Sequence, residues 1–262
     1  MDQPIPQAPD SAMAPEVIVK ACINGARPPS DHPALPVLPE QFAREARAAV
    51  DAGASLVHVH PRRADGAESL DAQTGTAVLT AIRQACPGVR VGVTTGAWIV
   101  PEPSRRLDLV RSWTTLPDFA SVNLSEDGAV RLCEELLGTG IGIEPGLATV
   151  EDARLLVASG LAPRAERLLV EVDGADDDQQ VGLAAAIDAL LDAAGVAAQR
   201  VHHGSERSTW AVLARAFDVG HHVRIGLEDT LVLPDGSTAR DNGELVAAAV
   251  TLARAHGRRP RR

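Results

Sequence analysis

The stretch Leu56-Val57-His58-Val59-His60 places two histidines two residues apart in an otherwise apolar run. Successive side chains of a β-strand point to opposite faces, so His58 and His60 share one face and the valines share the other. Two imidazoles side by side on one strand are suited to binding a divalent metal ion. The alternative is a hydrogen-bonded core histidine next to a solvated strand end. We therefore expect a buried strand whose end carries a metal site.

On both sides of this strand, short apolar runs alternate with Ala- and Leu-rich helical patterns. The predicted strands cover residues 17–22, 55–60, 89–94, 119–124, 140–144, 167–172, 200–203 and 223–227. The predicted helices cover residues 39–52, 72–84, 104–113, 129–137, 150–159, 180–194, 207–218 and 242–256. Strict βα alternation predicts a parallel sheet, and eight such units in about 250 residues predict a closed barrel.

The whole chain of 262 residues contains no linker that would divide it into two domains. We therefore predict an α/β fold with a single (β/α)₈ TIM barrel as the catalytic domain over residues 16–256. Residues 1–15, rich in Pro and Ala, are predicted to form a flexible N-terminal arm, and residues 257–262 a basic, solvated C-terminal tail. The acidic segment 173–179 is predicted to be a surface loop.

Composition narrows the class of partner. A net charge of −10 and a pI near 5.2 argue against nucleic acid as the main partner. No apolar run reaches the ~18 residues that cross a membrane, and the N-terminus lacks the order of a signal peptide. Cys22, Cys86 and Cys133 form no CxxC pair, which is typical of free thiols in a reducing cytoplasm. We expect a cytoplasmic protein with small-molecule partners and, as in many barrels, a homo-oligomer.

The end of the eighth predicted strand offers a third metal ligand. Active sites of such barrels lie at the C-terminal ends of the strands. Period two places Arg224, Gly226 and Glu228 on one face, which we expect to point inward. Two histidines and Glu228 would leave one coordination position open, as in catalytic zinc sites. Asp229, just past the strand, would be a general base or a partner of a ligand. The alternative is a structural Arg224–Glu228 ion pair.

Other strand ends add polar candidates. Glu144 ends the fifth predicted strand with inward parity, and one of His202 and His203 either reaches the site or has a role in a loop. The third and fourth strand ends carry hydroxyl and amide groups that would bind a carboxylate or a carbonyl oxygen: Thr94, Thr95, Ser121 and Asn123.

Lys20 is the sole lysine of the chain and lies within the first predicted strand. A desolvated lysine has a lowered pKa and can form a Schiff base with a carbonyl substrate. The alternative is an ammonium group that is paired with Glu228, Asp229 or Glu144, or that holds a substrate carboxylate.

Six segments in order resemble the β-keto acid cleavage enzymes, whose founding activity is 3-keto-5-aminohexanoate cleavage. They read KACINGA (20–26), LPVLPE (35–40), AGASLVHVHPR (52–62), TTG (94–96), ASVN (120–123) and RIGLED (224–229). The combination of His-x-His with Arg-x-Gly-x-Glu-Asp is specific, whereas Thr-Thr-Gly alone is weak. Together the segments span most of the chain, from about residue 17 to 252.

The resemblance implies a zinc-dependent barrel that exchanges acyl groups between a β-keto acid and acetyl-CoA, giving acetoacetate and a new acyl-CoA. It implies His58, His60 and Glu228 as ligands of one Zn²⁺. It also implies that Arg224, Asp229 and Glu144 handle the proton. Thr94 and Ser121 would contact a carboxylate or carbonyl group of the substrate. A base, most simply Asp229, would remove the proton between the carbonyl groups.

Three departures from the family pattern concern the substrates. Arg27 stands where relatives carry an acid, which predicts an anionic or neutral substrate rather than a cationic one. Lys20 replaces a polar residue and would bind the substrate carboxylate. An acidic segment, 171–178, replaces the Gly-rich loop that accommodates CoA. Alternative functions are a Schiff-base aldolase that uses Lys20, a metal-dependent hydrolase, or a barrel that binds metal or metabolite without turnover.

Overall fold

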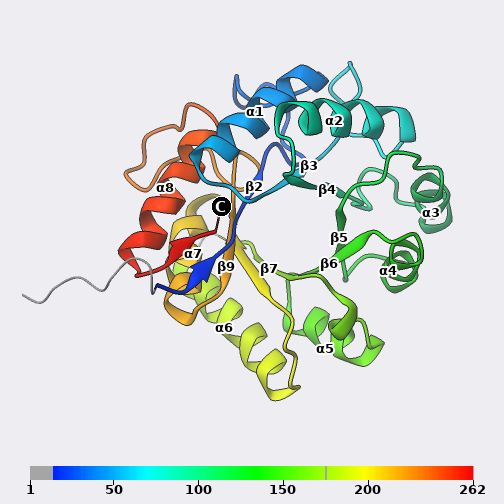
Figure 1. The fold of residues 1–262 in the computed structure, drawn as a ribbon. Coiled ribbons are helices and arrows are strands. Elements are labelled where there is room, and N and C mark those ends of the chain that lie inside the picture. Colours follow the sequence, from blue (N-terminus) through cyan, green and yellow to red (C-terminus); the bar gives the residue numbers. More distant parts are fainter. Residues whose placement is uncertain (1–13, 175, 262) are drawn as a thin grey trace, which may run out of the picture.

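The computed structural model describes residues 14–174 and 176–261, and within them the chain closes a parallel barrel of eight strands. Figure 1 looks along the barrel, with the strands as an inner ring. In barrel order the strands are β2 (Val19–Cys22), β3 (Leu56–Val59), β4 (Arg90–Thr94), β5 (Phe119–Asn123), β6 (Gly142–Leu147), β7 (Leu168–Val172), β8 (Arg200–Gly204) and β9 (His222–Ile225). The predicted (β/α)₈ barrel is confirmed.

The helices form the outer ring in Figure 1, one after each barrel strand. Asp71 shows how a local signal starts one of them, because its side chain accepts a hydrogen bond from the Thr74 backbone N–H at 2.8 Å. Two short 3₁₀ turns, Ala162–Arg164 and Glu206–Ser208, precede β7 and α7. The helices are α1 (Pro39–Ala52), α2 (Ala72–Ala85), α3 (Pro103–Arg111), α4 (Ala129–Gly138), α5 (Val150–Ser159), α6 (Asp177–Ala193), α7 (Thr209–Val219) and α8 (Asn242–Ala255).

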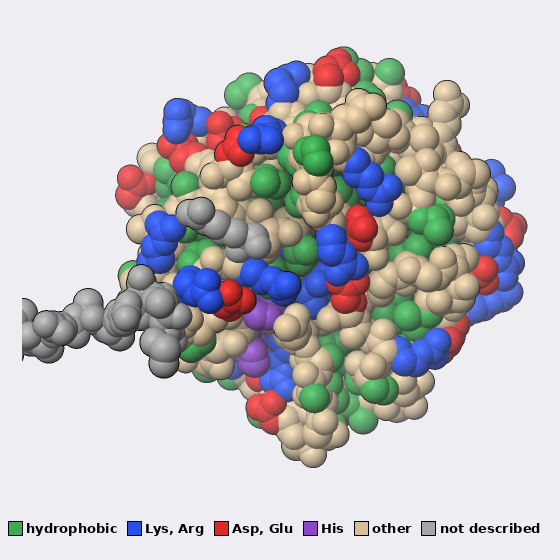
Figure 2. Space-filling model, viewed as in Figure 1, with side chains coloured by type: hydrophobic (Ala, Val, Ile, Leu, Met, Phe, Trp, Pro, Cys, Tyr) green, Lys and Arg blue, Asp and Glu red, His purple; other side chains and the backbone are tan. Residues whose placement is uncertain are grey.

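The two chain ends pair with each other beside the N-terminal ends of the barrel strands. β1 (Glu16–Val17) and β10 (Arg259–Pro260) form a parallel two-stranded sheet, in which Arg259 also forms an ion pair with Glu16 at 2.5 Å. The predicted solvated tail is therefore partly ordered, because its backbone finds hydrogen-bond partners in β1. On this face, basic and histidine side chains gather near the middle (Figure 2). Residues 1–13 of the predicted arm lie outside the described residues.

Several predicted boundaries moved by a few residues, and those of β6, β9 and α6 affect the site. β6 begins at Gly142 rather than at residue 140, because Gly140 still has the left-handed φ of 82° that follows α4, and Glu144 is therefore in mid-strand. β9 ends at Ile225, and Glu228 lies on the turn that follows. α6 begins at Asp177, within the predicted loop, because the Asp176 side chain caps it.

The lower part of the barrel interior is charged. Lys20 Nζ donates to Glu144 Oε2 at 2.6 Å, and Arg167 Nε donates to Glu144 Oε1 at 2.5 Å. Both cations lie over the ring of Phe119, at 5.5 Å for Lys20 and 4.8 Å for Arg167. The Phe119 ring fits because Gly92 faces it, where a Cβ would come within 2.0 Å of a ring carbon. This buried ion cluster forms a floor beneath the upper, C-terminal layer.

No helix in the described part of the chain is both long enough and apolar enough to span a bilayer.

Candidate active site

Three side chains converge at the C-terminal ends of the barrel strands. His58 lies on β3, His60 just after it, and Glu228 on the turn after β9. His58 Nε2 is 3.8 Å from Glu228 Oε2, and His60 Nε2 is 3.5 Å from Glu228 Oε1. One ligand atom from each residue lies within 4.8 Å of the others. The structure thus brings together the three residues that the sequence predicts as metal ligands.

The chemistry of this set fits a divalent metal ion. Burial holds the pKa of His58 well below its usual value, so its imidazole is neutral and keeps a free lone pair. Burial alone would lower the pKa of His60, but the nearby carboxylates of Glu228 and Glu68 raise it to about 9, so this place favours a positive charge. Glu228 Oε2 is buried without a hydrogen-bond partner among the described residues. These groups have the ligand types of a catalytic zinc site.

Two residues that the sequence did not reveal hold His60 in place. His60 Nδ1 lies 2.6 Å from Glu68 Oε1, which leaves Nε2 directed at Glu228. Trp98 Nε1 donates to the other Glu68 oxygen at 3.0 Å, and its ring stacks on His60 with centroids 5.9 Å apart. A carboxylate bound to the second nitrogen of a metal-binding histidine fixes its tautomer and orientation. Glu68 and Trp98 lie on loops, where no periodic pattern could indicate them.

Arg224 connects Glu228 to Asp229. Arg224 Nη2 donates to Glu228 Oε1 and to Asp229 Oδ1, both at 2.7 Å. Burial raises the pKa of Asp229 above its usual value even though Arg224 opposes the shift. The pKa of Glu228 stays well below its usual value despite burial, because Arg224 and the histidines lie close. The pKa of Asp229 is thus raised, whereas that of Glu228 is lowered. The Asp229 Oδ2 atom has no hydrogen-bond partner among the described residues.

Gly25 makes room for Glu228. Its φ of +57° lies in the left-handed region, and a Cβ there would come within 2.4 Å of Glu228 Cγ. The glycine thus permits the close approach of two loops, those after β2 and β9.

His203 and Glu171 complete a second polar group. His203 Nε2 lies 3.2 Å from Glu171 Oε2, and His203 Nδ1 lies 3.3 Å from Asp229 Oδ1. His203 is thus the member of the His202-His203 pair that reaches the site. Glu171 lies on β7, directly opposite β3 in the eight-strand order. The sequence carries a signal for Glu171, because this acid lies within an apolar strand with inward parity. The acidic residues that follow make it look instead like the start of the acidic segment 171–178.

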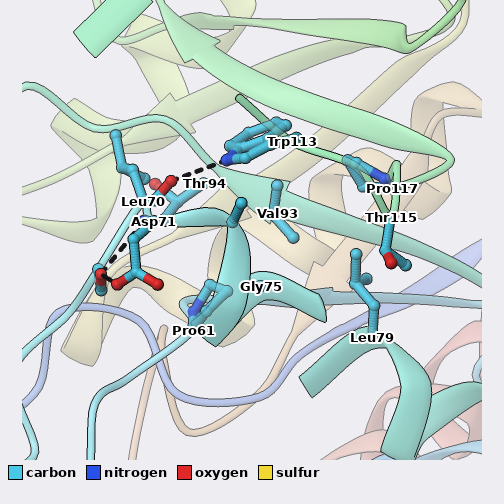
Figure 3. Close-up of a pocket in the computed structure, with 12 residues that line it drawn as sticks. Pro61, Leu70, Asp71, Gly75, Leu79, Val93, Thr94, Trp113, Thr115 and Pro117 are labelled. Atoms are coloured by element: carbon cyan, nitrogen blue, oxygen red, sulfur yellow. Dashed lines mark hydrogen bonds between the residues drawn. The ribbon is translucent and has the colours of Figure 1, made fainter. Parts of the chain in front are cut away.

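An open cavity of about 410 Å³ lies over these groups. Its walls carry metal-site, acid and amide side chains, including His60, Trp98, Asn123, Glu171, Arg224 and Asp229. A smaller cavity of about 10 Å³ lies between β4 and α2, where Trp113 Nε1 donates to Leu70 O at 2.8 Å (Figure 3). Its size is that of about one water molecule, so the larger cavity is the substrate-binding candidate.

Some predicted substrate contacts lie elsewhere. Thr94 and Ser121 are register neighbours in the barrel interior as expected, but Thr94 lines the small cavity of Figure 3. Thr95 Oγ1 donates to Ser121 O at 2.6 Å and so serves the backbone. Asn123 does line the large cavity, although its Nδ2 donates to Glu126.

Glu144 and Arg27 are placed differently from expectation, whereas Lys20 forms one of the ion pairs expected for it, the one with Glu144. Glu144 lies in the floor cluster with Lys20 and Arg167, because it is in mid-strand and not at a strand end. Lys20 is fully buried and paired there, and it is not among the residues that line the large cavity, which disfavours a Schiff-base aldolase. Arg27 is not among the residues that line the large cavity: its Nε donates to Leu227 O, and its guanidinium pairs with Glu206.

A second cluster outside the barrel combines Asp188, His202 and His221, with ligand atoms within 4.8 Å of one another. Two arginines already form ion pairs with the Asp188 carboxylate, through Arg200 Nη1 at 3.1 Å and Arg215 Nη2 at 2.7 Å. Their positive charges oppose a metal cation at this place. We assign the cluster to packing between β8, α6 and α7.

Comparisons with known proteins agree with the geometry. A family model described as beta-keto acid cleavage enzyme matches residues 16–134 and 146–262. The chain is similar to a 3-keto-5-aminohexanoate cleavage enzyme of Fusobacterium nucleatum, with 31% identity over 94% of each chain. It is also similar to a 3-oxoadipate:acetyl-CoA acetyltransferase of Cupriavidus necator, with 26% identity over 94% of this chain and 91% of the relative.

Solved structures share the barrel. ObcA in its binary complex with oxaloacetate superposes with a TM-score of 0.69 at 16% identity, over 87% of this chain. The chain spans 66% of the length of that protein. At this identity the likeness concerns the fold alone.

Proposed function

Since this chain belongs to the beta-keto acid cleavage enzyme family, we propose that it cleaves a β-keto acid by acyl exchange with acetyl-CoA, giving acetoacetate and a new acyl-CoA. We propose Zn²⁺ as its metal, one per chain, held by His58, His60 and Glu228. The observation that carries the proposal is this metal-type cluster beside the Arg224–Asp229 pair, on one cavity.

The metal would supply Lewis-acid chemistry, which withdraws electron density from the oxygens of a bound β-keto acid. Glu68 and Trp98 would keep His60 oriented toward it. The ligand types favour zinc over magnesium or calcium, which prefer sites made of oxygen atoms alone.

Asp229 would act as the general base. Its Oδ1 is held by Arg224, and its Oδ2 has no hydrogen-bond partner within the described part of the chain, so one oxygen remains to take the proton from the carbon between the two carbonyl groups. That carbon would attack the thioester carbonyl and release CoA thiolate. The thiolate would then attack the keto carbon, the bond between the two carbons would break, and Asp229 would return the proton to acetoacetate.

Acetyl-CoA as co-substrate is supported by the named activity of the Cupriavidus necator relative. α6 begins at Asp177, inside the acidic segment that takes the place of the Gly-rich loop. The open cavity mouth, rather than a Gly-rich loop, would therefore admit the thioester.

The test measures zinc in the purified protein by elemental analysis, for the wild type and for His58→Ala/His60→Ala. We expect about one zinc per chain in the wild type and none in the double variant. Acetoacetate formed from 3-oxo acids and acetyl-CoA is then measured for the wild type and for Asp229→Asn, which keeps the side-chain size. A wild type that binds no metal even after zinc is supplied would contradict the proposal. Full activity in Asp229→Asn would remove the base assignment alone.

A further inference from the structure

Another open cavity lies at the N-terminal ends of the barrel strands, at the opposite end of the barrel from the candidate active site. It has a volume of about 360 Å³ and lies between the loop before β8 and the turn before β9. Gln199, Arg200, His221 and His222 line it, and none of its lining residues is acidic. Histidine side chains lie among basic ones on this face of the molecule (Figure 2). A cavity of this size with polar walls suits a small polar ligand.

His222 offers a hydrogen-bond donor at this cavity. Its Nδ1 accepts from the Ile18 backbone N–H at 3.2 Å, so in the neutral ring the proton is on Nε2. The ring is neutral at pH 7, because burial and the charges of Arg167 and Arg261 lower its pKa to about 4. Nε2 donates to no residue in 14–174 or 176–261. The N–H group is therefore free to bind a ligand.

Two arginines beside His222 have no acidic partner in the described part of the chain. A Cβ placed on Gly220, which lines the cavity, would lie 3.5 Å from Arg258 Nη2. The Arg258 guanidinium donates to backbone carbonyl oxygens alone. The Arg261 backbone N–H donates to Val17 O at 2.8 Å, one residue before the N–H group that binds His222. Both positive charges at this place thus lack a carboxylate.

Neighbouring arginines differ in this respect. Arg200 forms ion pairs with Asp188 and Asp192, and Arg259 forms one with Glu16. The chain as a whole carries a net charge of −10, so most of its cations have acids within reach. Two guanidinium groups without counter-charges, next to a free imidazole N–H, are what an anion-binding site requires.

We propose that this cavity binds the phosphate group of a small molecule, with Arg258, Arg261 and His222 as its donors. Guanidinium groups match the spacing of phosphate oxygens, and two positive charges balance a phosphate dianion. The volume of the cavity leaves room for an organic part attached to the phosphate. Because the site lies at the strand N-terminal ends, it does not depend on the proposed cleavage reaction.

The test titrates inorganic phosphate and glycerol 3-phosphate into the full chain by calorimetry, at physiological ionic strength so that diffuse surface attraction is screened. We expect one site per chain. Arg261→Gln and His222→Asn should each weaken binding at least about tenfold, as the loss of a hydrogen bond to a charged group does. Asparagine retains an acceptor for the Ile18 N–H but lacks the Nε2 donor. The matched control is Arg259→Gln, which should stay within about threefold of the wild type because Glu16 already neutralises Arg259.

The double variant His58→Ala/His60→Ala should bind both compounds as the wild type does, since its substitutions lie at the other end of the barrel. Tighter binding of glycerol 3-phosphate would support a phosphorylated metabolite as the ligand, and equal binding would support free phosphate.

Four results would overturn the proposed site. They are no saturable binding by either compound, unchanged affinity in both Arg261→Gln and His222→Asn, an equal loss in Arg259→Gln, and loss of binding in the double histidine variant. The third would indicate diffuse surface charge only, and the fourth would place the anion at the metal ligands. Circular dichroism verifies that each variant is folded, and the zinc and cleavage assays are independent of all these outcomes.

Discussion

Glu144→Gln tests whether the floor of the barrel is a structural ion cluster. Glu144 is completely buried, and its two oxygens are 2.6 Å from Lys20 Nζ and 2.5 Å from Arg167 Nε. The amide keeps the size of the side chain but leaves Lys20, itself completely buried, without its counter-charge. Breaking one partner of a buried ion pair costs about 3–5 kcal/mol, which lowers the melting temperature of a chain of this size by on the order of 10 °C.

The assay is urea unfolding followed by circular dichroism and tryptophan fluorescence. The matched control is Glu134→Gln, because Glu134 pairs with Arg164 at 2.6 Å with both side chains 47% exposed. Such a surface pair contributes at most about 1 kcal/mol. The double variant Lys20→Met/Glu144→Gln should recover part of the loss, since the unpaired ammonium is then gone.

The reasoning would be refuted if Glu144→Gln unfolded within about 1 kcal/mol of the control, since a buried cation would then tolerate the loss of its partner. A stable Glu144→Gln protein that formed no acetoacetate would return Glu144 to the proton-handling group, where the sequence predicted it.

Three further perturbations have defined outcomes. Glu68→Gln should weaken zinc binding about 10- to 100-fold, measured by competition with a chelator, because His60 loses the carboxylate that orients it; unchanged affinity would contradict that role. Gly25→Ala should lower the zinc content and leave the circular dichroism spectrum unchanged, because a Cβ would displace Glu228. Full zinc occupancy would show that the loops after β2 and β9 can move apart. Burial and nearby arginines lower the pKa of His222 from 6.5 to about 4. On acidification the unfolded chain therefore binds this proton before the folded chain does, and the free energy of unfolding should fall as the pH drops from 6.5 to 4. His222→Asn should flatten the plot of this free energy against pH in that range, and an unchanged slope would assign the pH dependence to other groups.

The fold could be predicted because strands and helices differ in the spacing of their apolar residues, and because segments of the two kinds alternate along the chain without interruption. The metal cluster could be predicted because His58 and His60 share a face of one strand. Glu228 belongs to the metal cluster for a reason other than strand parity. β9 ends at Ile225, and the turn that follows brings the Glu228 side chain to the two histidines.

The remainder depended on contacts between distant loops and on exact strand limits. Glu144 was assigned to the wrong layer because a two-residue shift of β6 is invisible in an apolar run. Glu68 and Trp98 come from loops whose path only the folded chain defines. The turn of Arg27 toward Glu206 likewise depends on the loop after β8, which no local pattern connects to residue 27.

The pairing of β1 with β10 has a practical consequence for handling the molecule. Both ends leave the barrel beside the N-terminal ends of its strands, whereas the cavity opens at the C-terminal ends. A purification tag or a fused reporter protein joined to the chain directly before β1 or directly after β10 would therefore start on the side of the barrel away from the substrate entrance. The same adjacency makes the described part of the chain suited to circular permutation, in which a short linker joins β10 to β1 and new ends are opened in an outer loop.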